Sequence, residues 1–321
     1  MVTGDLPFPP SIAEKLRLEG LDVDLAPGVL SKGELARHLE GAWGYLLGGL
    51  EYADATLLEK CPELQAICFI GSGYSEFIDP LCVPPEVALA YTPGANAIAV
   101  AELMFGLTIS LRRQLVSMNN RVKNGSAPPQ GAFTPTLVGS TIGIIGMGHV
   151  GEAFARMSMG AYDAKIMFWN RTPKPHLTSE FGWTQCAIED VLRQCDVVAV
   201  SCAYHAIDTH HLLNLERLEL MQSHALLVSI ARSLLIDPTA LLAVLRDKKI
   251  CGAALDGYYL EPLPDPAHDP YNLLAFPGDV LIITPHIGSF SLDAVVKMFD
   301  MAADNMIAAA RGTQVPNPIP R

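Results

Sequence analysis

Short apolar runs alternate with amphipathic stretches along most of the chain. In the first hundred residues, the runs at 44–47 and 65–70 are typical of buried strands, while residues 11–19 and 57–60 have helical spacing. Alternating strands and helices predict parallel sheets covered by helices. A second series of the same kind begins after residue 140, with strands expected at 141–145, 165–169, 197–200, 225–230, 252–255 and 280–283, and helices at 188–194 and 238–246.

Two segments separate the two series. Residues 97–113 are apolar at helical spacing, and residues 124–137 are rich in Gly, Pro and Ser, which predicts a loop. A last amphipathic helix is expected over 292–311. We therefore predict an α/β fold with two doubly wound, Rossmann-like parallel-sheet domains and a cleft between them. We expect residues 1–108 and 292–321 to form one domain and residues 109–291 to form the other.

Three glycines follow the strand expected at 141–145. Gly146, Gly148 and Gly151 form a G-x-G-x-x-G pattern, and good helix formers come after it. Between a strand and a helix this pattern is typical of dinucleotide binding. Gly146 would allow a sharp turn, Gly148 a close approach of backbone to a pyrophosphate, and Gly151 tight packing of the helix on the strand. The alternative is an ordinary strand-to-helix turn that happens to be rich in glycine.

Composition narrows the class of protein. Half of the 321 residues are hydrophobic and 17% are charged, as in a compact protein with a large core. The sequence shows no long apolar run and no leader pattern, so we expect a cytoplasmic protein without a membrane partner. The net charge of −12 argues against nucleic acid as a partner. The seven cysteines include no C-x-x-C pair and most lie in apolar surroundings, so we expect buried free thiols, and we expect no metal site.

The residues after the strand at 165–169 indicate which dinucleotide binds. An acidic residue there accepts hydrogen bonds from the ribose 2′-hydroxyl of NAD, whereas an arginine suits the 2′-phosphate of NADP. Here the sequence reads Asn170-Arg171-Thr172, with Lys174 close behind and no carboxylate. We therefore expect NADP as the preferred cofactor and NAD as the second choice. Alternatively, Arg171 and Lys174 form only a solvated surface cluster.

Three polar residues follow expected strands further along the chain. Arg232 comes after 225–230, Glu261 after 252–255, and His286 after 280–283. A guanidinium can hold a carboxylate, and an imidazole can transfer the proton that accompanies a hydride. A carboxylate beside the imidazole fixes its tautomer. With the glycine pattern upstream, the three together indicate hydride transfer on a carboxylated substrate, although each alone could be an ordinary core or salt-bridge residue.

With these motifs the chain resembles the D-2-hydroxyacid dehydrogenase family over most of its length. It departs from the family pattern at Ser229 and Ser233, which stand in place of asparagine and glycine, and at Cys202-Ala203-Tyr204-His205, where the family has a segment with proline. The matching segments are 71–79, 93–113, the glycine pattern, 230–233, 254–256 with 261–264, and 284–288.

The resemblance implies a role for each residue. Arg232 would clamp the substrate, Glu261 would partner the imidazole, and His286 would act as acid and base. Backbone N–H groups around Ser72, Gly73 and Tyr74 would hold the substrate carboxylate, and Asp256 would support the site. The residues implied at the cofactor are Gly146, Gly148, His149, Val150, Gly151, Asn170, Arg171, Thr172, Ala231, Asp256 and Gly288.

The resemblance also implies an activity and an assembly. The first domain would bind substrate and the second the dinucleotide, and the protein would form a homodimer through the second. We predict an NADP(H)-preferring 2-hydroxyacid dehydrogenase that works as a 2-ketoacid reductase, with glyoxylate or hydroxypyruvate as substrate. Two alternatives stay open: a dehydrogenase-like sensor or corepressor that only binds the dinucleotide, and a reductase for a bulkier 2-ketoacid.

Overall fold

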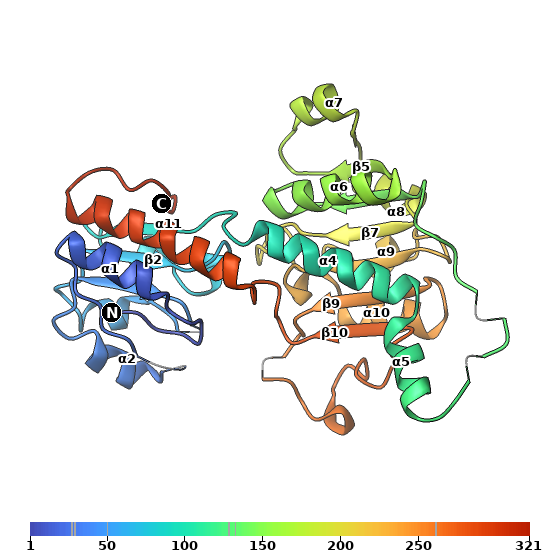
Figure 1. Ribbon diagram of the computed structural model, residues 1–321, viewed down its shortest axis with the longest axis horizontal. Helices are drawn as coiled ribbons and strands as arrows, with labels where there is room; N and C mark the ends of the chain where they lie inside the picture. The colour runs from blue at the N-terminus through green and yellow to red at the C-terminus, as the bar shows by residue number, and fades with distance from the viewer. Residues whose placement is uncertain (27, 29, 50, 128, 132, 261) are drawn as a thin grey trace. The chain divides into compact units, whose positions relative to one another are not determined.

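The computed structural model describes residues 1–321 except residues 27, 29, 50, 128, 132 and 261. The chain divides into two compact units (Figure 1). Unit 1 comprises Met1–Asn96 and Ser289–Arg321, and unit 2 comprises Ala97–Gly288. The units meet earlier in the sequence than the expected bounds at residues 108 and 291, because the helix that begins at residue 97 packs on the sheet of unit 2 along its length.

Unit 2 is built on a sheet in which seven strands are described. Their order is β10-β9-β8-β7-β4-β5-β6, and every neighbouring pair is parallel. The chain order reverses between β4 and β7, which is where a doubly wound sheet binds its ligand beyond the carboxyl ends of the strands. The strands are β4 (Thr141–Ile145), β5 (Lys165–Trp169), β6 (Thr184–Gln185), β7 (Val197–Val200), β8 (Leu226–Ser229), β9 (Gly252–Asp256) and β10 (Leu281–Thr284).

Helices cover both faces of this sheet (Figure 1). On one face α4 (Ala97–Arg112) and α6 (His149–Tyr162) pack on each other and on the central strands, and Met104 and Phe154 are fully buried there. On the other face, α8 (Ile188–Gln194), α9 (Leu215–Leu218) and α10 (Pro238–Arg246) enclose a second apolar core. Two more helices of this unit are α5 (Leu115–Lys123) and α7 (Pro175–Phe181).

Unit 1 has the same architecture on a smaller scale. Its described strands β1 (Gly44–Leu47), β2 (Ala66–Phe69) and β3 (Ala88–Tyr91) form a parallel sheet in that order. One face packs on α11 (Leu292–Ala310), which also contacts α1 (Pro10–Leu18). Side chains of α2 (Lys32–His38) and α3 (Ala55–Leu58) pack on the other face. The two parallel sheets confirm the predicted α/β fold class.

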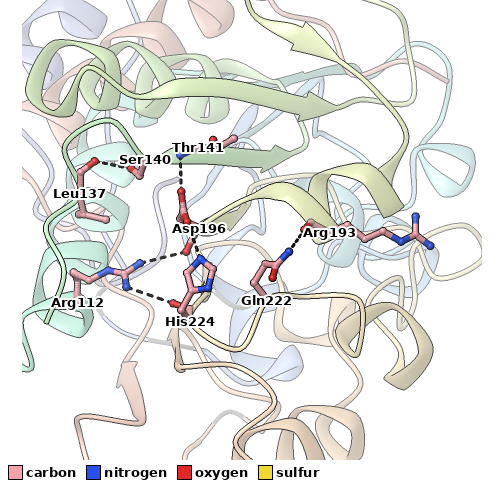
Figure 2. A network of polar contacts seen from close by, with 8 residues as sticks. All are labelled: Arg112, Leu137, Ser140, Thr141, Arg193, Asp196, Gln222 and His224. Atoms are coloured by element: carbon pink, nitrogen blue, oxygen red, sulfur yellow. Dashed lines mark hydrogen bonds and ion pairs between the residues drawn. The ribbon is translucent and has the colours of Figure 1, made fainter.

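A polar clamp ties the amino ends of three strands of unit 2 to the end of α4 (Figure 2). The guanidinium of Arg112 donates to the backbone carbonyls of Asp196 and His224, each at 3.4 Å. The Asp196 carboxylate accepts from the Thr141 N–H at 2.8 Å and from the His224 Nε2 at 2.8 Å. These residues precede or begin β7, β8 and β4. The clamp therefore holds the three strands together at their amino ends, the edge opposite the glycine loop.

Within the described part of the chain, no helix combines the length and apolar character needed to cross a bilayer.

Candidate active site

The glycine loop between β4 and α6 has the shape expected for holding a phosphate. Gly146 has φ +100°, and a Cβ there would lie 2.3 Å from the backbone nitrogen of Cys202. A Cβ on Gly151 would lie 2.5 Å from the carbonyl oxygen of Gly146, so helix and strand pack as closely as glycine permits. At Gly148, the N-cap of α6, a Cβ would meet no atom within 4 Å. The open backbone at a helix N-terminus suits a phosphate group, so the loop fits a dinucleotide.

Two side chains hold this loop from neighbouring strands. Asn170, which follows β5, accepts from the Met147 N–H at 3.1 Å and donates to the Thr172 carbonyl at 2.8 Å. Ser201, which follows β7, donates to the Gly146 carbonyl at 2.8 Å. Both polar atoms of the Asn170 amide therefore have partners in the protein, while its expected cofactor contact remains a prediction. Ser201 could not be predicted from the sequence, because its position after a strand is its sole distinguishing feature there.

Arg171 lies on the surface beside the same loop. Its guanidinium pairs with Asp208 at 3.5 Å, and the two side chains are 66% and 60% exposed. An exposed ion pair of this kind contributes about 0–1 kcal/mol, so a phosphate dianion could replace the carboxylate at small cost. The arrangement is compatible with the expected 2′-phosphate contact.

The predicted catalytic residues follow neighbouring strands. Arg232 lies three residues past β8 and is half-buried, and His286 lies two residues past β10 and is exposed. Because β8, β9 and β10 are parallel neighbours, both residues lie at the carboxyl edge of the sheet. Two strand spacings of roughly 4.8 Å separate β8 from β10. Glu261 is outside the described residues.

Asp256 fixes the loop that carries His286. Its carboxylate is 5% exposed at the end of β9. It accepts from the Thr284 hydroxyl at 2.7 Å, the Ile287 N–H at 2.8 Å and the Gly288 N–H at 2.8 Å. These three donors lie on both sides of His286, whose backbone has φ +55°, a left-handed conformation that costs a non-glycine residue about 1–3 kcal/mol. The Asp256 bonds therefore hold His286 in a conformation it would not adopt alone.

The predicted substrate loop follows β2 in unit 1. Gly71 donates its N–H to the Thr92 hydroxyl at 2.8 Å, and Ser72 accepts from the Gly94 N–H at 3.2 Å. Ser72 and Gly73 are exposed. The ring of Tyr74 packs edge-on against Tyr91 with centroids 5.2 Å apart, and burial raises the pKa of its hydroxyl. The loop is thus held at both ends while its middle faces solvent.

The remaining predicted cofactor residues lie around the same edge of unit 2. His149 and Val150 begin α6 next to the open Gly148. Ala231 directly precedes Arg232, and Gly288 lies against Asp256, where a Cβ would approach Oδ2 to 2.9 Å. Their contacts with a dinucleotide remain predictions.

Comparison with known proteins identifies the family of the chain. The family model described as D-isomer specific 2-hydroxyacid dehydrogenase, NAD binding domain, matches residues 105–288, more than half of the chain. The chain belongs to this family. A glyoxylate/hydroxypyruvate reductase B of Yersinia enterocolitica is 32% identical over 302 residues, 93% of this chain and 88% of the relative. A glyoxylate reductase of Pyrococcus horikoshii is 32% identical over 84% of this chain and 80% of its own.

The solved structures agree with this assignment. A crystal structure from Thermus thermophilus superposes with a TM-score of 0.88 at 30% identity and covers 99% of both chains. The chain is therefore an NAD(P)-binding oxidoreductase of the 2-hydroxyacid dehydrogenase family, which acts on small 2-ketoacid substrates.

Proposed function

We propose that this 2-hydroxyacid dehydrogenase family member works as a reductase of glyoxylate or hydroxypyruvate, with NADPH preferred over NADH. The observation that carries the proposal is that Arg232 and the His286 loop, which Asp256 holds, follow strands at the sheet edge that also bears the open glycine loop. The names of the two relatives support the choice of substrate.

The side chains divide the chemistry between them. When bound, the reduced nicotinamide supplies the hydride that reaches the carbonyl carbon of the substrate. His286 in its protonated form donates a proton to the carbonyl oxygen. Arg232 binds the substrate carboxylate and stabilises the negative charge that grows on the oxygen as the carbonyl is reduced. The exposed N–H groups around Ser72 and Gly73 would add hydrogen bonds to the carboxylate.

Replacement of the imidazole tests the catalytic assignment. His286→Ala should lower kcat by about 10²–10⁴-fold, the usual contribution of a general acid, because no other group would deliver the proton. Dinucleotide affinity, measured by fluorescence titration, should stay unchanged. His176→Ala removes an exposed histidine on α7 and is the matched control. A loss of dinucleotide affinity with kcat retained would contradict the role given to His286.

Reversal of the charge at residue 171 tests the cofactor preference. Arg171→Asp places a carboxylate where the 2′-phosphate of NADPH is expected, so the ratio of kcat/KM for NADPH to that for NADH should fall at least tenfold. Arg193→Asp changes an exposed arginine near the amino end of β7 and should leave the ratio unchanged. An unchanged ratio in Arg171→Asp would remove Arg171 from the cofactor site.

We also propose a homodimer formed through unit 2. Large apolar side chains stand exposed on one side of α5: Leu115 at 49% and Val122 at 72%, two helical turns apart. Exposed apolar side chains on one side of a surface helix are typical of protein interfaces. Sedimentation equilibrium should give twice the chain mass, and a monomer at micromolar concentration would refute the dimer.

A further inference from the structure

The amino-terminal side of the sheet in unit 2 carries a cavity, at the edge opposite the glycine loop and His286. It has a volume of about 520 Å³, within the range of small-molecule sites. The end of α4, the end of α10 and the starts of β9 and β10 form its wall. Three cationic side chains and one carboxylate line it, together with an exposed phenylalanine and a cysteine: Arg112, Arg246, Lys248, Asp279, Phe133 and Cys251.

Arg112 gives this cavity a buried positive charge. The residue is 5% exposed, and its Nε has no hydrogen-bond partner among the described residues. Within the described part of the chain, its other nitrogens donate to the two carbonyls of the clamp, at 3.4 Å (Figure 2). Burial lowers the pKa of the guanidinium, and the nearby thiol of Cys251 and carboxylate of Asp196 act in the opposite direction. The Nε is buried with the rest of the side chain, so Arg112 adds positive charge to the wall of the cavity rather than a hydrogen-bond donor for a ligand.

Cys251 is the exposed thiol of this cavity, directly before β9. Two exposed cations, Arg246 and Lys248, lie on the cavity wall with it, although Arg246 also pairs with Asp247 at 2.8 Å. An exposed thiol is accessible to a disulfide, and cations on the same wall attract a disulfide that carries negative charge.

The other six cysteines lack this setting. Cys61, Cys68 and Cys195 are buried, and burial raises their pKa, to about 12 for Cys68 and for Cys195. Burial also raises the pKa of the half-buried Cys186 and Cys202. Cys82 is exposed like Cys251, but it donates to the Asp79 carboxylate at 3.2 Å, and that bond raises its pKa.

We propose that Cys251 is a thiol-exchange site for small anionic disulfides, whose carboxylates bind to the exposed Arg246 and Lys248, with the buried charge of Arg112 behind them. In the exchange the Cys251 thiolate attacks one sulfur of the reagent. A new S–S bond forms as the bond within the reagent breaks, so Cys251 is oxidised and the departing half is reduced to a thiol. The departing thiolate takes up the proton that Cys251 lost.

Two disulfides of opposite charge test the proposal on the reduced, full-length protein. Glutathione disulfide carries carboxylates and cystamine carries ammonium groups, and peptide mapping by mass spectrometry gives the initial rate at each cysteine. At low ionic strength glutathione disulfide should modify Cys251 at least tenfold faster than Cys82. With cystamine, the preference for Cys251 over Cys82 should disappear or reverse, because the Asp79 carboxylate attracts the cationic reagent to Cys82.

Charge variants test whether Cys251 reacts quickly because the anionic disulfide binds to the nearby cations or only because its thiol is exposed. Neutralising the two exposed cations in R246Q/K248Q should slow glutathionylation of Cys251 about fivefold, since each charge at roughly 8 Å in water contributes a factor of about two to three. Added salt should slow the wild type in the same way and the variant less. Cys251→Ser should leave Cys82 as the slow site. Equal rates at the two cysteines with both reagents, or a Cys251 rate indifferent to salt and to R246Q/K248Q, would overturn the proposal.

Discussion

Asp256→Asn tests how the fold positions the catalytic imidazole. The asparagine has the same shape as the aspartate, so the change removes charge and one acceptor without opening a cavity. In the protein the carboxylate accepts three hydrogen bonds of 2.7–2.8 Å, and it is 5% exposed. The amide can keep the bonds of Oδ1 to Thr284 and Ile287, but its NH₂ group would then face the N–H of Gly288.

The expected loss follows from these contacts. A hydrogen bond to a charged group contributes about 1.5–3 kcal/mol, and the bond to Gly288 is lost entirely. The other two bonds become neutral ones at a cost of roughly 0.5 kcal/mol each. We therefore expect the free energy of unfolding to fall by about 2.5–4 kcal/mol. The left-handed conformation of His286 is then less well held, so kcat/KM for ketoacid reduction should fall 10–100-fold, the equivalent of about 1.4–2.7 kcal/mol.

Two assays on one variant decide the matter. Urea unfolding gives the change in stability, and oxidation of the reduced dinucleotide at saturating and limiting ketoacid gives kcat and KM. Asp247→Asn is the matched control. Asp247 is exposed, and its ion pair among the described residues is with its neighbour Arg246. The free energy of unfolding should therefore change by less than about 0.5 kcal/mol. If Asp256→Asn destabilised the protein with kcat/KM unchanged, Asp256 would hold the fold but not His286. If neither changed, the geometric argument would be wrong.

Two further predictions concern the glycine loop and acid stability. Gly146→Ala would place a Cβ 2.3 Å from backbone at Cys202 with φ +100°, and should lower both the unfolding free energy and dinucleotide affinity. Gly148→Ala meets no atom within 4 Å, so it should weaken only dinucleotide binding; equal stability losses in both variants would contradict this. Burial raises the pKa of Asp269, but bonds from the Leu274 N–H and the Tyr258 hydroxyl outweigh burial and lower it overall. Its stabilisation is thus complete above the unfolded-state pKa of about 4 and is lost as the pH falls through the lower folded-state pKa. Urea unfolding should show a smaller acid loss in Asp269→Asn, and an identical pH slope would refute this.

Most of the secondary structure follows from local sequence. The strand expected at 44–47 and the helix expected at 238–246 coincide with β1 and α10. Continuous apolar runs mark strands that are buried on both faces, and Asp237-Pro238 is a clear helix start, with the Asp237 side chain accepting from two backbone N–H groups. No strand was expected from the sequence at β3, although its pairing with β2 completes the smaller sheet. It consists of only four residues, and pairing partners are not visible in a local pattern.

The sequence by itself determined the glycine loop, the parallel strands and the order of Arg232, Glu261 and His286, because each depends on residue type and spacing. The tertiary structure alone decided which groups are already engaged. Asn170 braces the glycine loop, Asp256 holds the residues around His286, and α4 belongs wholly to unit 2. It also brought Cys251 to the same cavity as Arg112, although 139 residues separate them along the chain from position 112 to 251. Such contacts arise from packing between distant segments, and no local periodicity encodes them.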